Sequence, residues 1–228
     1  MNIEDEVQAY YRDALDEHHR YRSWEHCYSY FREKRPLGLG QDRDQAAIQL
    51  AFYLASWGMY RGSSFLLQYT YTVHRAAIDA IDAQCFTTLW NTDFGSKRVE
   101  KALVPTVCEL IQELRRAYKP FALRIGPAQP TDTLITKIIL GTFGCLPACD
   151  RYFLSGFKSE GFKYSSLNEE FVTAVFEYCQ SNICDFQRQQ KTLQKQSGVN
   201  YPLMKLVDMC FWQIGYQQTA GTLPEGRS

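Results

Sequence analysis

Apolar residues recur at steps of three and four along most of the chain, and this period constrains the fold more than any other sequence feature. The spacing places apolar side chains on one face of a helix, whereas a half-buried strand requires strict alternation, which few segments show. We therefore predict an all-α fold, with about ten helices if each periodic segment forms one. The 228 residues suffice for a single domain, or for two small lobes that share a cleft.

The expected helices differ in how much of their surface is apolar. Residues 45–56 are apolar nearly all round, which predicts a central, buried helix. His74 is expected at the surface, and Pro105 is expected to kink or divide the helix that Ser96 opens. The other expected helices cover residues 4–19, 21–33, 65–72, 72–83, 134–140, the segment after Asp150, 167–197 (one helix or a pair) and 203–216.

Composition limits the classes of function. The chain has 25 basic and 25 acidic residues, which argues against coating nucleic acid by bulk charge but leaves room for a local basic groove. No apolar run approaches the roughly 20 residues of a membrane span, and the polar, acidic start is unlike a signal peptide. The eight cysteines are scattered without the spacing of zinc ligands. We expect a cytoplasmic monomer with free thiols and with no metal, cofactor or membrane partner.

The stretch from Thr131 to Lys163 organises the functional interpretation. Its apolar segment ends between Gly141 and Gly144, a Cys-Leu-Pro-Ala-Cys connection follows, and Asp150 opens an amphipathic segment. Asp is among the best residues for capping a helix N-terminus, so one interpretation of Asp150 is purely structural. The other interpretation is a catalytic carboxylate.

The pattern of a helix, Phe143-Gly144, a proline-containing bend and Asp150 resembles the helix-hairpin-helix DNA glycosylase superfamily. In that family the Asp heading the next helix is the catalytic carboxylate, so the resemblance implies this role for Asp150. The family's Leu-Pro-Gly-Val-Gly hairpin would fall at residues 127–131, which read Pro-Ala-Gln-Pro-Thr. Alignment on Phe143-Gly144 puts Thr133 where lyase-type members carry a Schiff-base lysine, with Lys137 one turn further on. The resemblance therefore implies a monofunctional glycosylase.

A second region, after residues 45–56, resembles the family's Ser-centred loop that probes or wedges the DNA stack. Ser56 matches the family's Ser, and the loop residues Trp57, Met59, Tyr60 and Arg61 have side chains that stack on bases or reach phosphates. The loop lacks the family's usual Gln-containing motif. The alternative is that Trp57 and Tyr60 fill the core while Arg61 pairs with an acid.

Taken together, the resemblance implies that the chain binds double-stranded DNA, extrudes a modified base into a cleft between two lobes, and hydrolyses its N-glycosidic bond with Asp150. Lys137 and Arg151 are further candidates for DNA contacts, and Trp24 and Tyr152 for stacking in the substrate pocket. The base is expected to be a hypermodified cytosine, such as glucosylated hydroxymethylcytosine in phage DNA, or a base removed in repair. Two alternatives remain: a non-catalytic helical module that binds nucleic acid or a partner, and a metal-dependent nuclease, for which the sequence offers no cluster of metal ligands.

Overall fold

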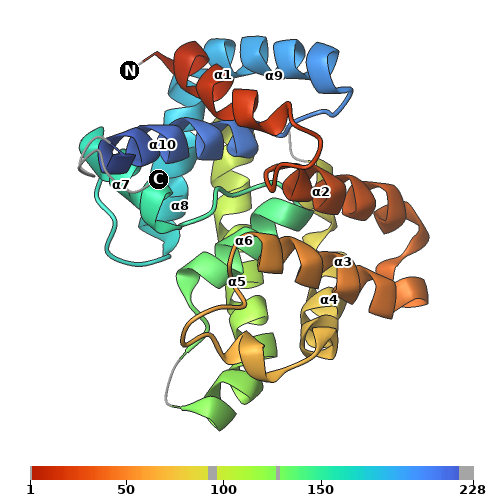
Figure 1. Ribbon diagram of the computed structural model, residues 1–228. Coiled ribbons are helices and arrows are strands. Elements are labelled where there is room, and N and C mark those ends of the chain that lie inside the picture. The colour runs from red at the N-terminus through yellow and green to blue at the C-terminus, as the bar shows by residue number, and fades with distance from the viewer. Residues whose placement is uncertain (1, 92–96, 127–128, 221–228) are drawn as a thin grey trace.

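The computed structural model describes residues 2–91, 97–126 and 129–220, and it confirms the all-α prediction (Figure 1). These residues form helices and connections without a β-strand. The ten α-helices in the described ranges are α1 (Ile3–Ala14), α2 (Arg22–Lys34), α3 (Arg43–Ser56), α4 (Arg75–Asp82), α5 (Lys97–Ile125), α6 (Asp132–Thr142), α7 (Arg151–Ser159), α8 (Glu169–Ser181), α9 (Ile183–Ser197) and α10 (Leu203–Ala220). None of the described helices is long and apolar enough to cross a bilayer.

Short 3₁₀ turns replace one of the predicted helices. Residues 65–72, expected as an apolar helix, form part of two turns, η3 (Phe65–Gln68) and η4 (Tyr71–His74). Ser64 and Thr70 cap these turns by accepting hydrogen bonds from the N–H groups two residues on, which favours two tight turns over one helix. The remaining 3₁₀ segments are η1 (Arg35–Leu37), η2 (Leu39–Asp42) and η5 (Gln84–Asn91).

The central helix is α6, which corrects the prediction for residues 45–56. Every residue of α6 from Leu134 to Thr142 is buried, and the helix contacts α2, α3 and α5 around it (Figure 1). On α3, in contrast, Ile48 and Phe52 are 41% and 62% exposed. Apolar composition alone does not distinguish a buried helix from one with a partly exposed apolar face.

Two ambiguities of the periodic pattern are resolved. The helix α5 continues through Pro105, and the segment 167–197 is a pair, α8 and α9, which meet at Asn182. The predicted capping residue Ser96 lies outside the described residues, as do residues 127 and 128 of the hairpin position.

Two glycines allow α7 and α10 to cross in close contact. A methyl group added at Gly156 on α7 would lie closer than 3.0 Å to the Phe211 carbonyl oxygen, and one at Gly215 on α10 would do the same to the Tyr152 carbonyl oxygen. Small residues at a crossing let two helix backbones approach each other. The position of α7, and of the residue that begins it, is therefore set by α10.

His74 is fully buried, which corrects its expected surface position. Its Nε2 and Nδ1 atoms lie 2.6 Å from the Tyr60 and Tyr118 hydroxyls, respectively. These hydroxyls satisfy both ring nitrogens of a neutral imidazole. Burial lowers the pKa of His74 to about 3.

This burial predicts a loss of stability in mild acid. In the unfolded chain His74 titrates near 6.5, so below that pH the unfolded state binds a proton that the folded state excludes until about pH 3. The stabilising contribution is complete above pH 6.5 and falls by about 2 kcal/mol at pH 5. Urea unfolding at pH 7.5 and pH 5 measures this loss, and His74→Gln should reduce it. An equal loss in the variant would contradict the assignment.

Candidate functional site

The connection between α6 and α7 places Asp150 at a helix N-terminus. After α6 ends at Thr142, Gly144 adopts the left-handed conformation with φ of 68° and donates its N–H to the Ile139 carbonyl at 2.9 Å. The connection then returns to extended backbone at Asp150. The Asp150 Oδ1 atom accepts hydrogen bonds from the Tyr152 and Phe153 N–H groups, each at 3.1 Å. The predicted capping role of Asp150 is confirmed.

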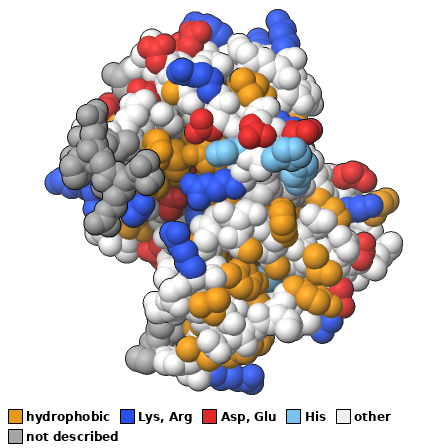
Figure 2. All heavy atoms as spheres, in the orientation of Figure 1, with side chains coloured by type: hydrophobic (Ala, Val, Ile, Leu, Met, Phe, Trp, Pro, Cys, Tyr) orange, Lys and Arg blue, Asp and Glu red, His pale blue; other side chains and the backbone are white. Residues whose placement is uncertain are grey.

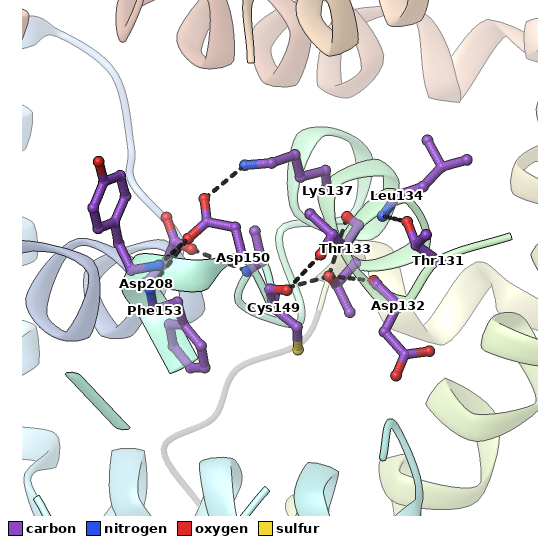
Figure 3. Close-up of polar contacts among 12 residues, drawn as sticks. Thr131, Asp132, Thr133, Leu134, Lys137, Cys149, Asp150, Phe153 and Asp208 are labelled. Carbon is purple, nitrogen blue, oxygen red and sulfur yellow. Dashed lines mark hydrogen bonds and ion pairs between the residues drawn. The ribbon is translucent and has the colours of Figure 1, made fainter. Parts of the chain in front are cut away.

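The other carboxylate oxygen of Asp150 faces a lysine from α6. The Lys137 Nζ atom lies 3.0 Å from Asp150 Oδ2, and the two side chains are 5% and 16% exposed. Figure 3 shows the lysine reaching from α6 toward the carboxylate. The same ammonium lies 4.5 Å from the centre of the Trp57 ring. The carboxylate thus accepts three hydrogen bonds, and a capping role requires only the two from the backbone.

Asp150 and Lys137 lie on the wall of a cleft of about 920 Å³. Besides Asp150, the charged residues that line it within the described ranges are all cationic, namely Arg20, Arg61, Lys137 and Arg151. The aromatic residues of the wall include Trp57, Tyr152 and Trp212. Figure 2 shows Lys and Arg side chains near the middle of this face of the molecule, beside an apolar patch. A cationic, partly aromatic cleft with a single carboxylate suits an anionic ligand that carries a ring.

Six of the predicted binding residues line this cleft with Asp150. These residues are Trp57, Met59, Arg61, Lys137, Arg151 and Tyr152. The Arg151 guanidinium lies over the Tyr152 ring, 4.4 Å from its centre, and also donates to its hydroxyl. The loop after α3 and the start of α7, which are far apart in the chain, thus face the same space.

Three predicted residues do not line the cleft. Trp24, expected in the substrate pocket, is 1% exposed and stacks on Tyr28 in the core, while its indole N–H donates to the Leu140 carbonyl. This corrects its assignment, because a ring packed in this way has no free face for a substrate. The Ser56 hydroxyl donates to the Phe52 carbonyl within α3. Tyr60 is half-buried with its hydroxyl on His74, as in the packing interpretation.

The contacts of Trp57 agree both with a packing role and with a binding role for its loop. Its ring stacks on Tyr21 at 5.3 Å and contacts Trp212 edge to face at 6.5 Å, so it belongs to an aromatic cluster. It also lines the cleft and receives the Lys137 ammonium on its face. Trp57 therefore contacts the same Lys137 ammonium that pairs with Asp150.

Several residues of the site were not predicted from the sequence. Arg20 and Trp212 line the cleft, and Asp208 with Lys205 supports the connection that precedes Asp150. For the last two a signal was present: Lys205 and Asp208 are the only charged residues of the segment 203–220, three positions apart in an otherwise largely apolar helix. Charged residues in such a helix are buried only when they are paired. Arg20 stands in a polar segment that offers no comparable signal.

Cysteine chemistry and metal binding find no support at this site. The eight cysteines, all of which lie in the described ranges, form no disulfide. Burial raises the pKa of the Cys145 thiol to about 12 and that of Cys149 well above its ordinary value, so neither supplies a thiolate at neutral pH. Within the described ranges no group of three or more His, Cys, Asp or Glu side chains is arranged to hold a metal ion. Comparisons with protein-family models, curated proteins and solved structures give no match.

Proposed function

We propose that the protein is a monofunctional DNA glycosylase that hydrolyses the N-glycosidic bond of a base flipped into the cleft. The observation that carries the proposal is the position of Asp150: its carboxylate opens onto a cleft whose other charged residues, among those described, are cationic. The cations can neutralise phosphates of the DNA backbone, and the carboxylate can stabilise the positive charge that develops on the sugar. The resemblance around Phe143-Gly144 and Asp150 supports the same reaction class.

In this mechanism the base leaves as positive charge builds on C1′ and the ring oxygen of the deoxyribose. Asp150 stabilises that charge electrostatically and orients the water that attacks C1′. Because Asp150 Oδ1 accepts two backbone N–H groups, we assign the water to Oδ2, beside the Lys137 ammonium. The bond to the base breaks with its electron pair on the base, which takes a proton from solvent, while the oxygen of this water bonds to C1′ and the Asp150 carboxylate takes the proton of the water.

The size of the cleft favours a base with a bulky substituent. Its volume of about 920 Å³ is near the upper end of the range for ligand sites, about 300 to 1,000 Å³. Trp57 and Tyr152 offer aromatic faces for a base or for a sugar attached to it. A hypermodified cytosine such as glucosylated hydroxymethylcytosine fits this description, and removal of such a base would serve defence against phage.

The cleft cations predict a salt-dependent interaction with DNA. Arg61→Ala and Arg151→Ala should each weaken duplex binding and reduce the slope of log affinity against log salt by about 1, because each removes one phosphate contact. Arg188→Ala on α9 is the matched control, since Arg188 is exposed, pairs with Asp185 and does not line the cleft. Binding titrations at several salt concentrations measure the slopes. Equal slopes for all three variants would contradict a role of the cleft in DNA binding.

A base-release assay tests the proposed function. The wild-type protein is incubated, in EDTA and in parallel with Mg²⁺, with phage DNA containing glucosylated hydroxymethylcytosine and with duplexes that carry oxidised, alkylated or mismatched bases. We expect a free base and an abasic site that breaks only after alkali treatment. Strand breakage that depends on a divalent metal would instead show a nuclease. Duplex binding without base release from any substrate would favour the non-catalytic module, which the capping role of Asp150 also permits.

A further inference from the structure

A buried ion pair on α10 holds the peptide that leads into Asp150. The Asp208 Oδ1 atom accepts a hydrogen bond from the Ala148 N–H at 3.0 Å, and its Oδ2 atom lies 2.7 Å from the Lys205 ammonium. The side chains of Asp208 and Lys205 are 5% and 3% exposed. Figure 3 shows Asp208 reaching the backbone beside Asp150. The cleft does not reach either side chain of the pair.

Stability alone does not account for this pair. Taking two charges out of water costs several kcal/mol for each ion, and apolar residues of similar size often replace such pairs without loss. Burial lowers the pKa of Lys205, which shows the cost of keeping its ammonium charged in this place. The ammonium is also surrounded by the rings of Tyr10 and Trp24, at 4.7 and 5.3 Å from their centres. The pair is thus buried among aromatic rings at the point where α10 meets the connection.

Side chains from α6 complete the support of the same connection. The Cys149 N–H donates to Thr136 Oγ1 at 2.8 Å, and the Cys149 carbonyl accepts from Thr133 Oγ1 at 2.7 Å. The peptide groups just before Asp150 are therefore held by α6 on one side and by Asp208 on the other. This explains how a connection without regular secondary structure fixes the direction of one carboxylate.

The helix α10 also holds the chain just after Asp150. Gly215 packs against the Tyr152 carbonyl, and Trp212 contacts the Tyr152 ring edge to face at 5.0 Å. One helix thus determines the position of the backbone on both sides of the carboxylate. We propose that Asp208, whose charge Lys205 balances, is a positioning residue for Asp150 through its hydrogen bond to the Ala148 N–H, an inference that rests on the proposed function.

Two double variants separate positioning from stability. Asp208→Asn with Lys205→Met removes the charge pair but keeps an oxygen that accepts from the Ala148 N–H. Asp208→Leu with Lys205→Met removes the pair and the acceptor together. Asn and Leu are similar in size, and neither variant leaves a buried charge without its partner. The two proteins therefore differ mainly in one hydrogen bond to the peptide that leads into Asp150.

The readouts are the single-turnover rate of base release and the affinity for a duplex that carries a tetrahydrofuran abasic analogue. We expect the Asn/Met variant to keep at least about a third of the wild-type rate, and the Leu/Met variant to lose about 100-fold, as for a carboxylate displaced by about 1 Å. Both should bind the duplex within about twofold of wild type, because the cleft cations are unchanged. Asp208→Ala with Lys205→Met serves as a second variant without an acceptor, should the Leu/Met protein not fold.

The decisive control combines each of the two double variants with Asp150→Asn. Once the carboxylate is gone, losing the Asp208 acceptor should lower the residual rate by less than about threefold, because residues that act through one group are not additive. Equal rates for the two double variants, or a full 100-fold loss in the Asp150→Asn background, would overturn the positioning role alone. A wild-type protein that releases no base from any substrate would overturn the proposed function, and the inference with it.

Discussion

Asp150→Asn should lower the single-turnover rate of base release by at least about 10³-fold, because the variant removes the only negative charge that the described residues place at the cleft. A loss of this size corresponds to about 4 kcal/mol of transition-state stabilisation. The affinity for duplex DNA should stay the same or rise, since a carboxylate in a cationic cleft repels phosphates. The effect thus falls on the chemical step and not on binding, which sets it apart from the arginine variants.

The controls for Asp150→Asn address its structural role. Asn caps helices as well as Asp does, so α7 should keep its start. The amide has one acceptor oxygen in place of two, and Lys137 loses its charged partner. Asp150→Asn with Lys137→Met removes that unpaired ammonium and should recover thermal stability without recovering base release. Asp44→Asn makes the same chemical change at an exposed pair with Arg75 and should be neutral. A rate for Asp150→Asn within about threefold of wild type would contradict the catalytic assignment.

Adding a methyl group where α7 and α10 cross should have the largest effect on stability. Gly156→Ala and Gly215→Ala each place a methyl group against a backbone carbonyl of the other helix, and a backbone cannot yield as a flexible side chain does. We expect each to destabilise the protein by about 3 kcal/mol or more, although Ala favours a helix by about 1 kcal/mol over Gly. Because Asp150 caps α7, the rate of base release should also decrease, even at temperatures at which the variants remain folded.

The matched control for the crossing is Gly40→Ala in η2. A methyl group there would meet only the Asp82 carboxylate at 3.8 Å, an ordinary contact, so we expect a change of less than about 0.5 kcal/mol. Urea unfolding of the three variants measures the difference. If Gly156→Ala and Gly215→Ala behaved like Gly40→Ala, the two helices would not be in the close contact described.

The period of apolar residues was enough to predict the fold class and the helix that Asp150 caps, because both depend on local sequence. It did not predict which helix is central. Residues 45–56 and α6 are both largely apolar, and only packing shows that α3 exposes Phe52 whereas α6 is buried from Leu134 to Thr142. The burial of His74 likewise depends on Tyr118 of α5, which lies 44 positions away in the chain.

The candidate site was predictable where its residues are near one another in sequence and not where they meet through the fold. Arg151 and Tyr152 follow Asp150 directly, and the loop with Trp57 and Arg61 was assigned through its resemblance to the family's Ser-centred loop. Asp208, however, reaches Ala148 across 60 positions, and no local pattern encodes that contact. Trp24 illustrates the reverse error, since an aromatic residue suited to stacking is more often part of the core.

In the proposed mechanism, the Asp150 carboxylate stabilises positive charge on a deoxyribose in the cleft. Binding to two duplexes tests it most directly, one carrying a cationic pyrrolidine and the other a neutral tetrahydrofuran in place of the target sugar. The wild-type protein should prefer the cationic duplex by about tenfold or more, as expected for a mimic of the transition state, and Asp150→Asn should lose that preference. An equal preference in both proteins would show that Asp150 acts only as a helix cap.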